Sequence, residues 1–278
     1  MKRIIFPFLL CFFLIPSAGA QNAETQTKPS VVELKMACDR VVIEAKQLYR
    51  YEKSAWVLED VAVEKRPGLF EEMGGWFPVF SSENSDLVKG VFFNQDKTKA
   101  LVEASYNFKT RATSCKEEVR DLTSEEIATI NAREKALLAV RTLEEELPSR
   151  PTECTFNTEV IPIGQNLYRV YWMLGTAQHG VIPFGCDFSY DCDSEGNVKA
   201  FRRYHKTYIP AQLKMEDGSN VDTIYHSHLS FCPFIAPTDI ALFMLYGAGV
   251  AELKILSTVY DCVFTFNPST FTVSVEEL

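Results

Sequence analysis

The sequence has few histidines and comparatively little positive charge. Only four of its 278 residues are histidine, and 28 lysines and arginines stand against 37 aspartates and glutamates, which gives a formal net charge of −9. Nucleic-acid binding requires a concentrated basic surface, so this balance argues against that class of protein. Because histidine is scarce, two histidines that lie close together in the chain are an informative feature.

Beyond residue 20 the sequence lacks an apolar run long enough to cross a bilayer. The nearest candidate, Ile240 to Tyr246, is far too short, so we expect no membrane span. Before residue 20, a positively charged start precedes the apolar stretch Ile4 to Pro16, and small residues lead up to Ala20. This pattern predicts a secretory signal peptide over residues 1–20, followed by a flexible polar leader over residues 21–30. The expected location is therefore periplasmic or secreted.

The sequence also lacks a CxxC pair and the GxSxG, GxGxxG and Walker motifs. Seven of its eight cysteines lie beyond the predicted signal peptide, and because this number is odd, at least one thiol cannot pair within the chain. One or two disulfides are compatible with an oxidising compartment, and Cys186 and Cys192 are the closest pair in sequence. Buried free thiols are equally compatible with the pattern.

The N-terminal part of the predicted mature chain has the pattern of a small α+β unit over residues 31–115. Apolar residues recur at helical spacing from Val31 to about Tyr51. Two strand-like segments, Val88–Phe93 and Ala100–Phe108, follow and are joined by a polar turn. This unit contains no recognisable chemical motif.

Residues 124–278 are expected to form a second domain, in which a mixed sheet is flanked by helices, so the fold class is α+β. A helix with a capping box begins at Thr123 or Ser124 and ends before Pro148. A second helix begins at Pro237, is apolar on all sides to Tyr246, and is therefore expected to be buried. Strands are predicted at residues 155–163, 167–174, 184–190, 197–209, 221–228, 252–257, 262–267 and 271–275.

The tripeptide His226-Ser227-His228 is the feature that points most directly to chemistry. Alternate residues of a strand face the same side, so both imidazoles can converge on one point, as two ligands of a metal ion do. Asp239, at the start of the predicted buried helix, is the natural third ligand. The alternative is that both histidines are ordinary polar residues and that Asp239 is a helix N-terminal acid favoured by the helix dipole.

The other two histidines, His179 and His205, are expected to have structural roles. His205 lies in the basic segment Arg202-Arg203-Tyr204-His205-Lys206. This segment is compatible with a small anion-binding patch, but a solvated strand edge is the more economical interpretation.

The spacing of the histidines and the aspartate resembles the metal-binding signature of the JAMM metalloproteases, the active members of the MPN-domain family. That signature is His-x-His, seven residues, Ser, two residues and Asp, and the spacing here agrees with it throughout. The resemblance covers residues 124–278 and implies a JAMM/MPN-like fold, related to that of cytidine deaminases. It also implies a zinc ion held by His226, His228 and Asp239, and hydrolysis of a peptide, isopeptide or related amide bond in a peptide or amide-containing substrate.

Several positions depart from the family pattern. The motif serine is replaced by Ala236, and Leu229 stands where a proline usually follows the second histidine. The family's general base is a glutamate in the first strand after the long helix, which corresponds here to Glu159, with Glu153 as the alternative. The resemblance thus implies an exported zinc-dependent peptidase or amidase. Loss of the serine hydroxyl, which helps to stabilise the oxyanion, favours the alternative of an exported binding or structural protein with an inactive JAMM-like fold.

Overall fold

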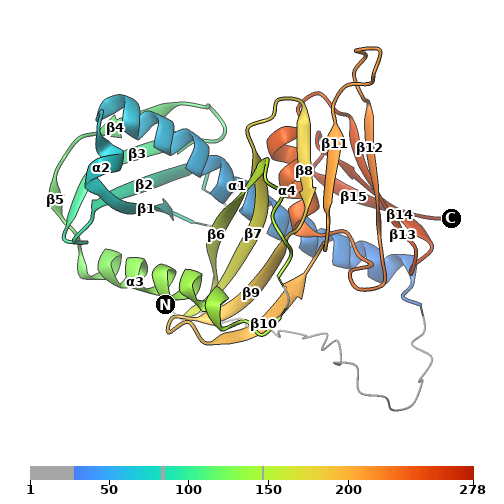
Figure 1. Ribbon diagram of the computed structural model, residues 1–278, viewed down its shortest axis with the longest axis horizontal. Helices are drawn as coiled ribbons and strands as arrows, with labels where there is room; N and C mark the ends of the chain where they lie inside the picture. Colours follow the sequence, from blue (N-terminus) through green and yellow to red (C-terminus); the bar gives the residue numbers. More distant parts are fainter. Residues whose placement is uncertain (1–27, 83–84, 146) are drawn as a thin grey trace, which may run out of the picture.

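The computed structural model describes residues 28–82, 85–145 and 147–278, and it has a mixed α+β fold with several sheets and a few helices (Figure 1). The predicted signal peptide at residues 1–20 and most of the predicted leader lie outside the described residues. Within the described ranges, no helix is both long enough and apolar enough to cross a membrane.

Two of the helices, α1 and α3, begin where the sequence supplies a capping side chain. Ser30 and Thr123 each form a capping box with a glutamate three residues later. The first helix starts as predicted but runs past Tyr51, because buried residues continue at helical spacing through Leu58 and Ala62. The helix predicted from Thr123 or Ser124 ends at Leu138, well before Pro148, and a tighter 3-10 turn follows it directly. The bounds are α1 (Val31–Lys65), α2 (Leu69–Glu72), α3 (Ser124–Leu138), η1 (Ala139–Thr142) and α4 (Pro237–Tyr246).

An antiparallel sheet with the strand order β1-β2-β3-β4, in which β5 also pairs with β3, forms the N-terminal part of the fold. Its β2–β3 hairpin confirms the two strands predicted there. The bounds are β1 (Met73–Phe80), β2 (Leu87–Asn94), β3 (Lys99–Asn107), β4 (Thr113–Lys116) and β5 (Arg120–Asp121).

Three further sheets follow, with the strand orders β10-β9-β7-β6, β11-β8 and β12-β13-β14-β15. In the last of these, β12 and β13 are parallel and are connected through α4, whereas the other pairs are antiparallel. The bounds are β6 (Cys154–Gly164), β7 (Leu167–Thr176), β8 (Val181–Gly185), β9 (Phe188–Asp193), β10 (Val198–Arg203), β11 (Tyr208–Gln212), β12 (Thr223–His228), β13 (Glu252–Ser257), β14 (Cys262–Asn267) and β15 (Thr272–Glu277).

Two strands predicted as continuous are each broken, and the two breaks lie side by side. The segment predicted at residues 184–190 divides into β8 and β9, and the segment predicted at 197–209 divides into β10 and β11. Gly185 and Cys186 have φ values of 97° and 56°, which interrupt the extended backbone. A Cβ atom on Gly185 would lie 2.0 Å from the carbonyl oxygen of Thr207, so only glycine permits this approach.

Helix α1 contributes to two hydrophobic clusters. Its first half, including Leu34 and Leu48, packs with α4 and the β12–β15 sheet. Its second half, including Leu58 and Ala62, packs with β2 and β3. Figure 1 shows α1 running from one sheet to the other, which ties the N-terminal part of the chain to the rest of the fold. The predicted burial of α4 is confirmed over its first seven residues, Pro237 to Phe243.

All seven cysteines in the described part of the chain are free. Cys186 and Cys192, the pair considered for a disulfide, are both buried but belong to separate hydrophobic clusters. These cysteines are therefore free thiols that are buried or partly buried.

A pair of buried carboxyl groups lies where α1 meets β6. Glu159 of β6 is hydrogen-bonded to Glu52 of α1, which also accepts a hydrogen bond of 2.6 Å from the amide of Asn157. Burial raises the pKa of Glu159 well above its usual range, and the neighbouring Glu52 raises it further, although Arg133 opposes both effects. The pair therefore retains a proton at a pH where isolated glutamates have lost theirs.

The variant Glu159→Gln is expected to change the pH dependence of stability. The folded protein keeps this carboxyl protonated above pH 4.5, whereas the unfolded chain releases the proton, so the free energy of unfolding falls as the pH rises above 4.5. Glutamine removes this penalty, and thermal unfolding should show a Tm about 2–4 °C above that of the parent at pH 7.5, but not at pH 4.5. Exposed Glu153→Gln is the control. A lower Tm for Glu159→Gln at pH 7.5 would indicate an ionised Glu159 paired with Arg133.

Candidate metal centre

Four side chains from three parts of the chain meet in the interior of the C-terminal region. His226 and His228 project from the same side of β12, and Asp239 lies in the first turn of α4. His205 comes from the connection between β10 and β11. Their possible ligand atoms all lie within 4.8 Å of one another, so the group can hold a metal ion.

Most of the distances among these atoms are short. Nε2 of His228 lies 2.9 Å from Nε2 of His205 and 3.2 Å from Nε2 of His226. The carboxylate of Asp239 lies 3.1 Å, 3.2 Å and 3.5 Å from the Nε2 atoms of His226, His228 and His205, respectively. Ligands about 2.0–2.1 Å from a tetrahedral zinc ion are separated by about 3.3 Å, and these five distances lie close to that value.

Hydrogen bonds to the other ring nitrogens fix how two of the histidines present their lone pairs. Nδ1 of His228 lies 2.8 Å from the carbonyl oxygen of Phe234, which can only accept, so this nitrogen carries the proton and donates it. Nδ1 of His205 donates in the same way to Asp187, at 2.6 Å. In the neutral rings both Nε2 atoms are therefore acceptors, so their 2.9 Å approach needs either a proton on one of the rings or a metal ion beside them.

The electrostatics of the group are those of a buried cation site. Burial acts to lower the pKa of His228, but the carboxylate of Asp239 outweighs it and raises the pKa to about 11. Burial lowers the pKa of His226. For Asp239, burial acts in the upward direction, but the surrounding imidazoles hold the pKa well below its usual range. Without a metal ion the group thus retains a proton, and a metal ion has to displace it. We therefore expect the metal affinity to decrease as the pH is lowered.

The position of His205 depends on the paired breaks in the strands. The turn at Gly185 and Cys186 places Asp187 against the β10–β11 connection, and the backbone N–H of Tyr204 donates to the carbonyl of Asp187 at 3.0 Å. The side chain of Asp187 then orients His205. A carboxylate that holds the far nitrogen of a ligating histidine is a common support in metal sites, because it fixes the tautomer and increases ligand basicity.

Asp239 is fixed by the start of α4. One carboxylate oxygen accepts a 2.8 Å hydrogen bond from the backbone N–H of Ala236, the N-cap residue, and the side chain is fully buried. This hydrogen bond leaves the other oxygen, Oδ1, directed at His226. The acidic residue therefore serves both as the helix cap and as a member of the group.

Of the residues predicted for the site, the structure brings together His226, His228 and Asp239. Glu159, the predicted general base, is buried beside Glu52 and is not a member of the group, and Glu153 is exposed and also lies outside it. The hydroxyl of Thr238 is buried without a hydrogen-bond partner in the described part of the chain, and the same holds for Nδ1 of His226.

The expectation that His205 lies on a solvated strand edge was wrong. His205 is 4% exposed and belongs to the metal-ligand group, together with its supporting residue Asp187, which the sequence did not single out. The basic residues Arg203 and Lys206 suggested a solvated segment, but the chain leaves β10 there and turns Tyr204 and His205 inward. Because the sequence has only four histidines, each of them could have been treated as a candidate ligand, and His205 would then have been considered.

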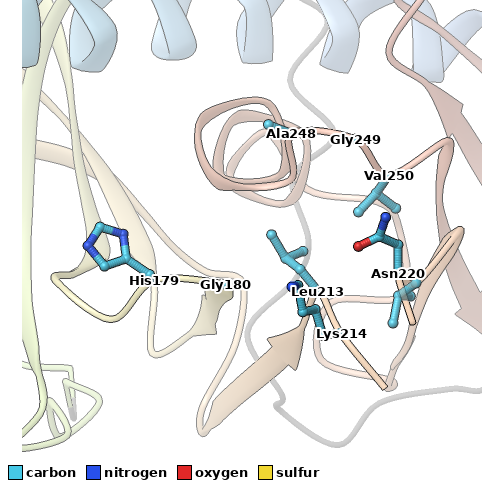
Figure 2. Close-up of a pocket in the computed structure, with 9 residues that line it drawn as sticks. His179, Gly180, Leu213, Lys214, Asn220, Ala248, Gly249 and Val250 are labelled. Atoms are coloured by element: carbon cyan, nitrogen blue, oxygen red, sulfur yellow. The ribbon is translucent and has the colours of Figure 1, made fainter. Parts of the chain in front are cut away.

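The fourth histidine, His179, lies elsewhere. It is exposed and lines a cavity of about 350 Å³ together with Lys214 and Asn220 (Figure 2). Figure 2 shows this cavity beside Ala248 and Gly249, which follow the C-terminal end of α4, whereas Asp239 lies at the N-terminal end. The cavity is therefore separate from the metal-ligand group.

No family model matches the chain, and neither curated proteins nor solved structures gave a match. The assignment of this centre therefore rests on its geometry and chemistry.

If His205 is a metal ligand, its replacement should weaken metal binding. We expect the purified protein to bind one zinc ion, and His205→Ala to lower the affinity by at least about tenfold, measured by competition with a chromophoric chelator. Asp187→Asn should lower it by about 10-fold to 100-fold, because the amide cannot hold the ring as the carboxylate does. Exposed His179→Ala is the matched control and should bind as the parent does. Equal affinities for His205→Ala and the parent would remove His205 from the ligand set.

Proposed function

We propose that the chain is a zinc-binding protein whose ion is held by His205, His226, His228 and Asp239 in a closed centre. In this proposal it is an exported binding or structural protein with an inactive JAMM-like domain. Three histidines and a carboxylate are a donor set that zinc accepts. Export is inferred from the signal-peptide pattern at residues 1–20.

The observation that carries this proposal is a fourth side chain able to act as a ligand. Structural zinc sites are four-coordinate with protein ligands alone, whereas catalytic sites have three and keep one position open for water or substrate. The Nε2 atom of His205, 2.9 Å from that of His228, is placed to supply the fourth ligand. Because all four side chains are at most 5% exposed, solvent has little access to the ion.

The positions that match the JAMM signature support the proposed fold, and the positions that depart from it support the proposed absence of activity. The parallel strands β12 and β13, with α4 between them, carry a His-x-His pair and an aspartate at the family spacing. Two features of the chain favour the inactive alternative. Ala236 offers no hydroxyl, and Glu159 is a buried carboxyl hydrogen-bonded to Glu52, whose raised pKa makes it a poor candidate for an ionised base.

Zinc in this position would act as a cross-link. It would connect the β10–β11 segment through His205, the edge strand β12 through two ligands, and α4 through Asp239. Metal binding of this kind contributes directly to folding free energy, because the unfolded chain has no preformed site. The ion would thus stabilise the C-terminal part of the fold.

A second candidate function is a zinc-dependent peptidase or amidase acting on a peptide, isopeptide or related amide bond. The buried hydroxyl of Thr238, which lacks a partner among the described residues, favours it, because this group adjoins the ligand Asp239 and can replace the missing serine hydroxyl. Activity would require His205 to leave the ion so that water can bind in its place. The two functions therefore differ in whether His205 stays bound.

The visible spectrum of the cobalt-substituted protein distinguishes a closed from an open centre. With four protein ligands we expect an intense tetrahedral spectrum that does not change between pH 6 and 9, because no bound water ionises. His205→Ala opens a position for water, whose pKa on a metal of this kind falls to about 7, so its spectrum should change with pH.

A pH-dependent spectrum in the unmodified protein would contradict the closed centre. Hydrolysis of casein or of peptide nitroanilides by the parent, absent from His226→Ala, would support the peptidase instead.

A further inference from the structure

Helix α1 carries apolar side chains on two opposite sides of its first half. The inner side, which includes Leu34 and Ala45, is buried against α4 and the β12–β15 sheet. Val32, Met36 and Ile43 lie on the other side and are 68%, 63% and 69% exposed, respectively. At 3.6 residues per turn these three positions fall within about 40° of one another, so they form one line along the helix. We call these three residues the outer stripe.

The packing of the chain itself does not explain the outer stripe. A helix at the surface of a globular protein needs one apolar side, and the opposite side is normally polar. The inner side of α1 already meets this need. Single exposed hydrophobic residues are ordinary, but Val32, Met36 and Ile43 follow one another at steps of four and seven residues. This is the spacing with which one helix packs along another.

Charged side chains of both signs lie beside and within the outer stripe. Glu33 and Lys35 lie beside its first turn, and Asp39 and Arg40 lie between its second and third members. Lys35, Asp39 and Arg40 are exposed, and none of them forms an ion pair or a side-chain hydrogen bond with any residue that the structure describes. These charges are therefore available to a partner.

The order of the charges is complementary to itself when two copies of the helix run in opposite directions. With Val32 of each copy level with Ile43 of the other, Lys35 of each lies within one residue of Asp39 of the other, about 1.5 Å along the axis. Two-fold symmetry then repeats this pair of opposite charges. In a parallel pair in register, Lys35 would face Lys35 and Asp39 would face Asp39, which is repulsive.

We propose that the outer stripe is a dimerisation surface, on which a second copy of this chain packs its own α1 in the antiparallel direction. The two stripes form the apolar centre of the contact. The Lys35–Asp39 pairs form its rim together with Glu33 and Arg40, which the same alignment brings within two residues of each other. The inference does not rest on the proposed zinc centre, because none of the four candidate ligands lies on α1.

The size of the contact indicates a weak dimer. The stripe spans about 18 Å of helix, and a helix pair of this length buries less than about 1,200 Å² in total, which is the range of weak and transient interfaces. We therefore expect a dissociation constant of about 100 µM, or somewhat tighter, in buffer of about 0.15 M salt.

Analytical ultracentrifugation of the purified protein between about 5 µM and 300 µM tests this association, and the average mass should rise from that of a monomer toward that of a dimer. Met36→Gln with Ile43→Gln should weaken the association at least about tenfold, because glutamine preserves the helix but removes the apolar contact. Val119→Gln with Met215→Gln changes two exposed apolar residues elsewhere and should leave the association unchanged.

Charge reversal tests the antiparallel alignment. Lys35→Glu alone and Asp39→Lys alone each place like charges opposite one another, so each variant should dimerise at least about threefold more weakly than the parent. Mixing the two single variants, or combining both changes in one chain, puts opposite charges across the contact again and should restore the affinity of the parent. Lys89→Glu on β2 changes the net charge as Lys35→Glu does and is the control.

A parent that stays monomeric over this range would overturn the proposal. If that monomer co-sedimented with phosphatidylcholine vesicles, the stripe would be assigned to a lipid surface instead of a second copy. Undiminished dimerisation of the Met36→Gln, Ile43→Gln variant would place the interface elsewhere and would also overturn the outer stripe. A weakened dimer in this variant, with a Tm equal to that of the parent at about 5 µM, would show that association and not folding was lost.

Discussion

The 2.9 Å approach of two imidazole nitrogens, Nε2 of His205 and Nε2 of His228, is the constraint that the surrounding structure has to satisfy. The far nitrogen of each ring already donates, to Asp187 and to the carbonyl of Phe234, so neither ring can reverse its tautomer without losing a buried hydrogen bond. Either a proton held by one of the rings or a metal ion makes this arrangement favourable. The fully buried carboxylate of Asp239 balances that charge, and the group as a whole therefore has the composition of a metal site.

The sequence predicted the local features of this site and missed the long-range one. The spacing of His226 and His228 on a strand, and the position of Asp239 at a helix start, follow from periodicity and capping alone. His205 could not be placed in the same way, because its approach to β12 depends on an interruption of the strands where Gly185 lies close to the carbonyl of Thr207. The continuous strand predicted there would have kept its histidine at the surface. Short-range patterns report secondary structure, whereas ligand sets are assembled by tertiary contacts.

The N-terminal region shows a similar division between local and tertiary information. The start of α1 and the β2–β3 hairpin were predicted correctly, because capping and alternation are local signals. The buried contact between Glu52 and Glu159 was not predictable, since both residues look like ordinary surface acids in sequence. Glu159 lies in the strand expected to carry a general base, but its carboxyl is buried against Glu52, where α1 meets β6.

Ala236 stands where the JAMM signature has a serine, and the proposed closed centre gives that hydroxyl no role. Its backbone N–H still donates to the carboxylate of Asp239 at 2.8 Å, a bond that corresponds to one of the two in the capping boxes at Ser30 and Thr123. A metal with four protein ligands has no position for an activated water, so a hydroxyl beside an oxyanion would have nothing to stabilise. The fourth candidate ligand His205 and the absence of a hydroxyl at Ala236 are therefore both what the proposed closed centre would require.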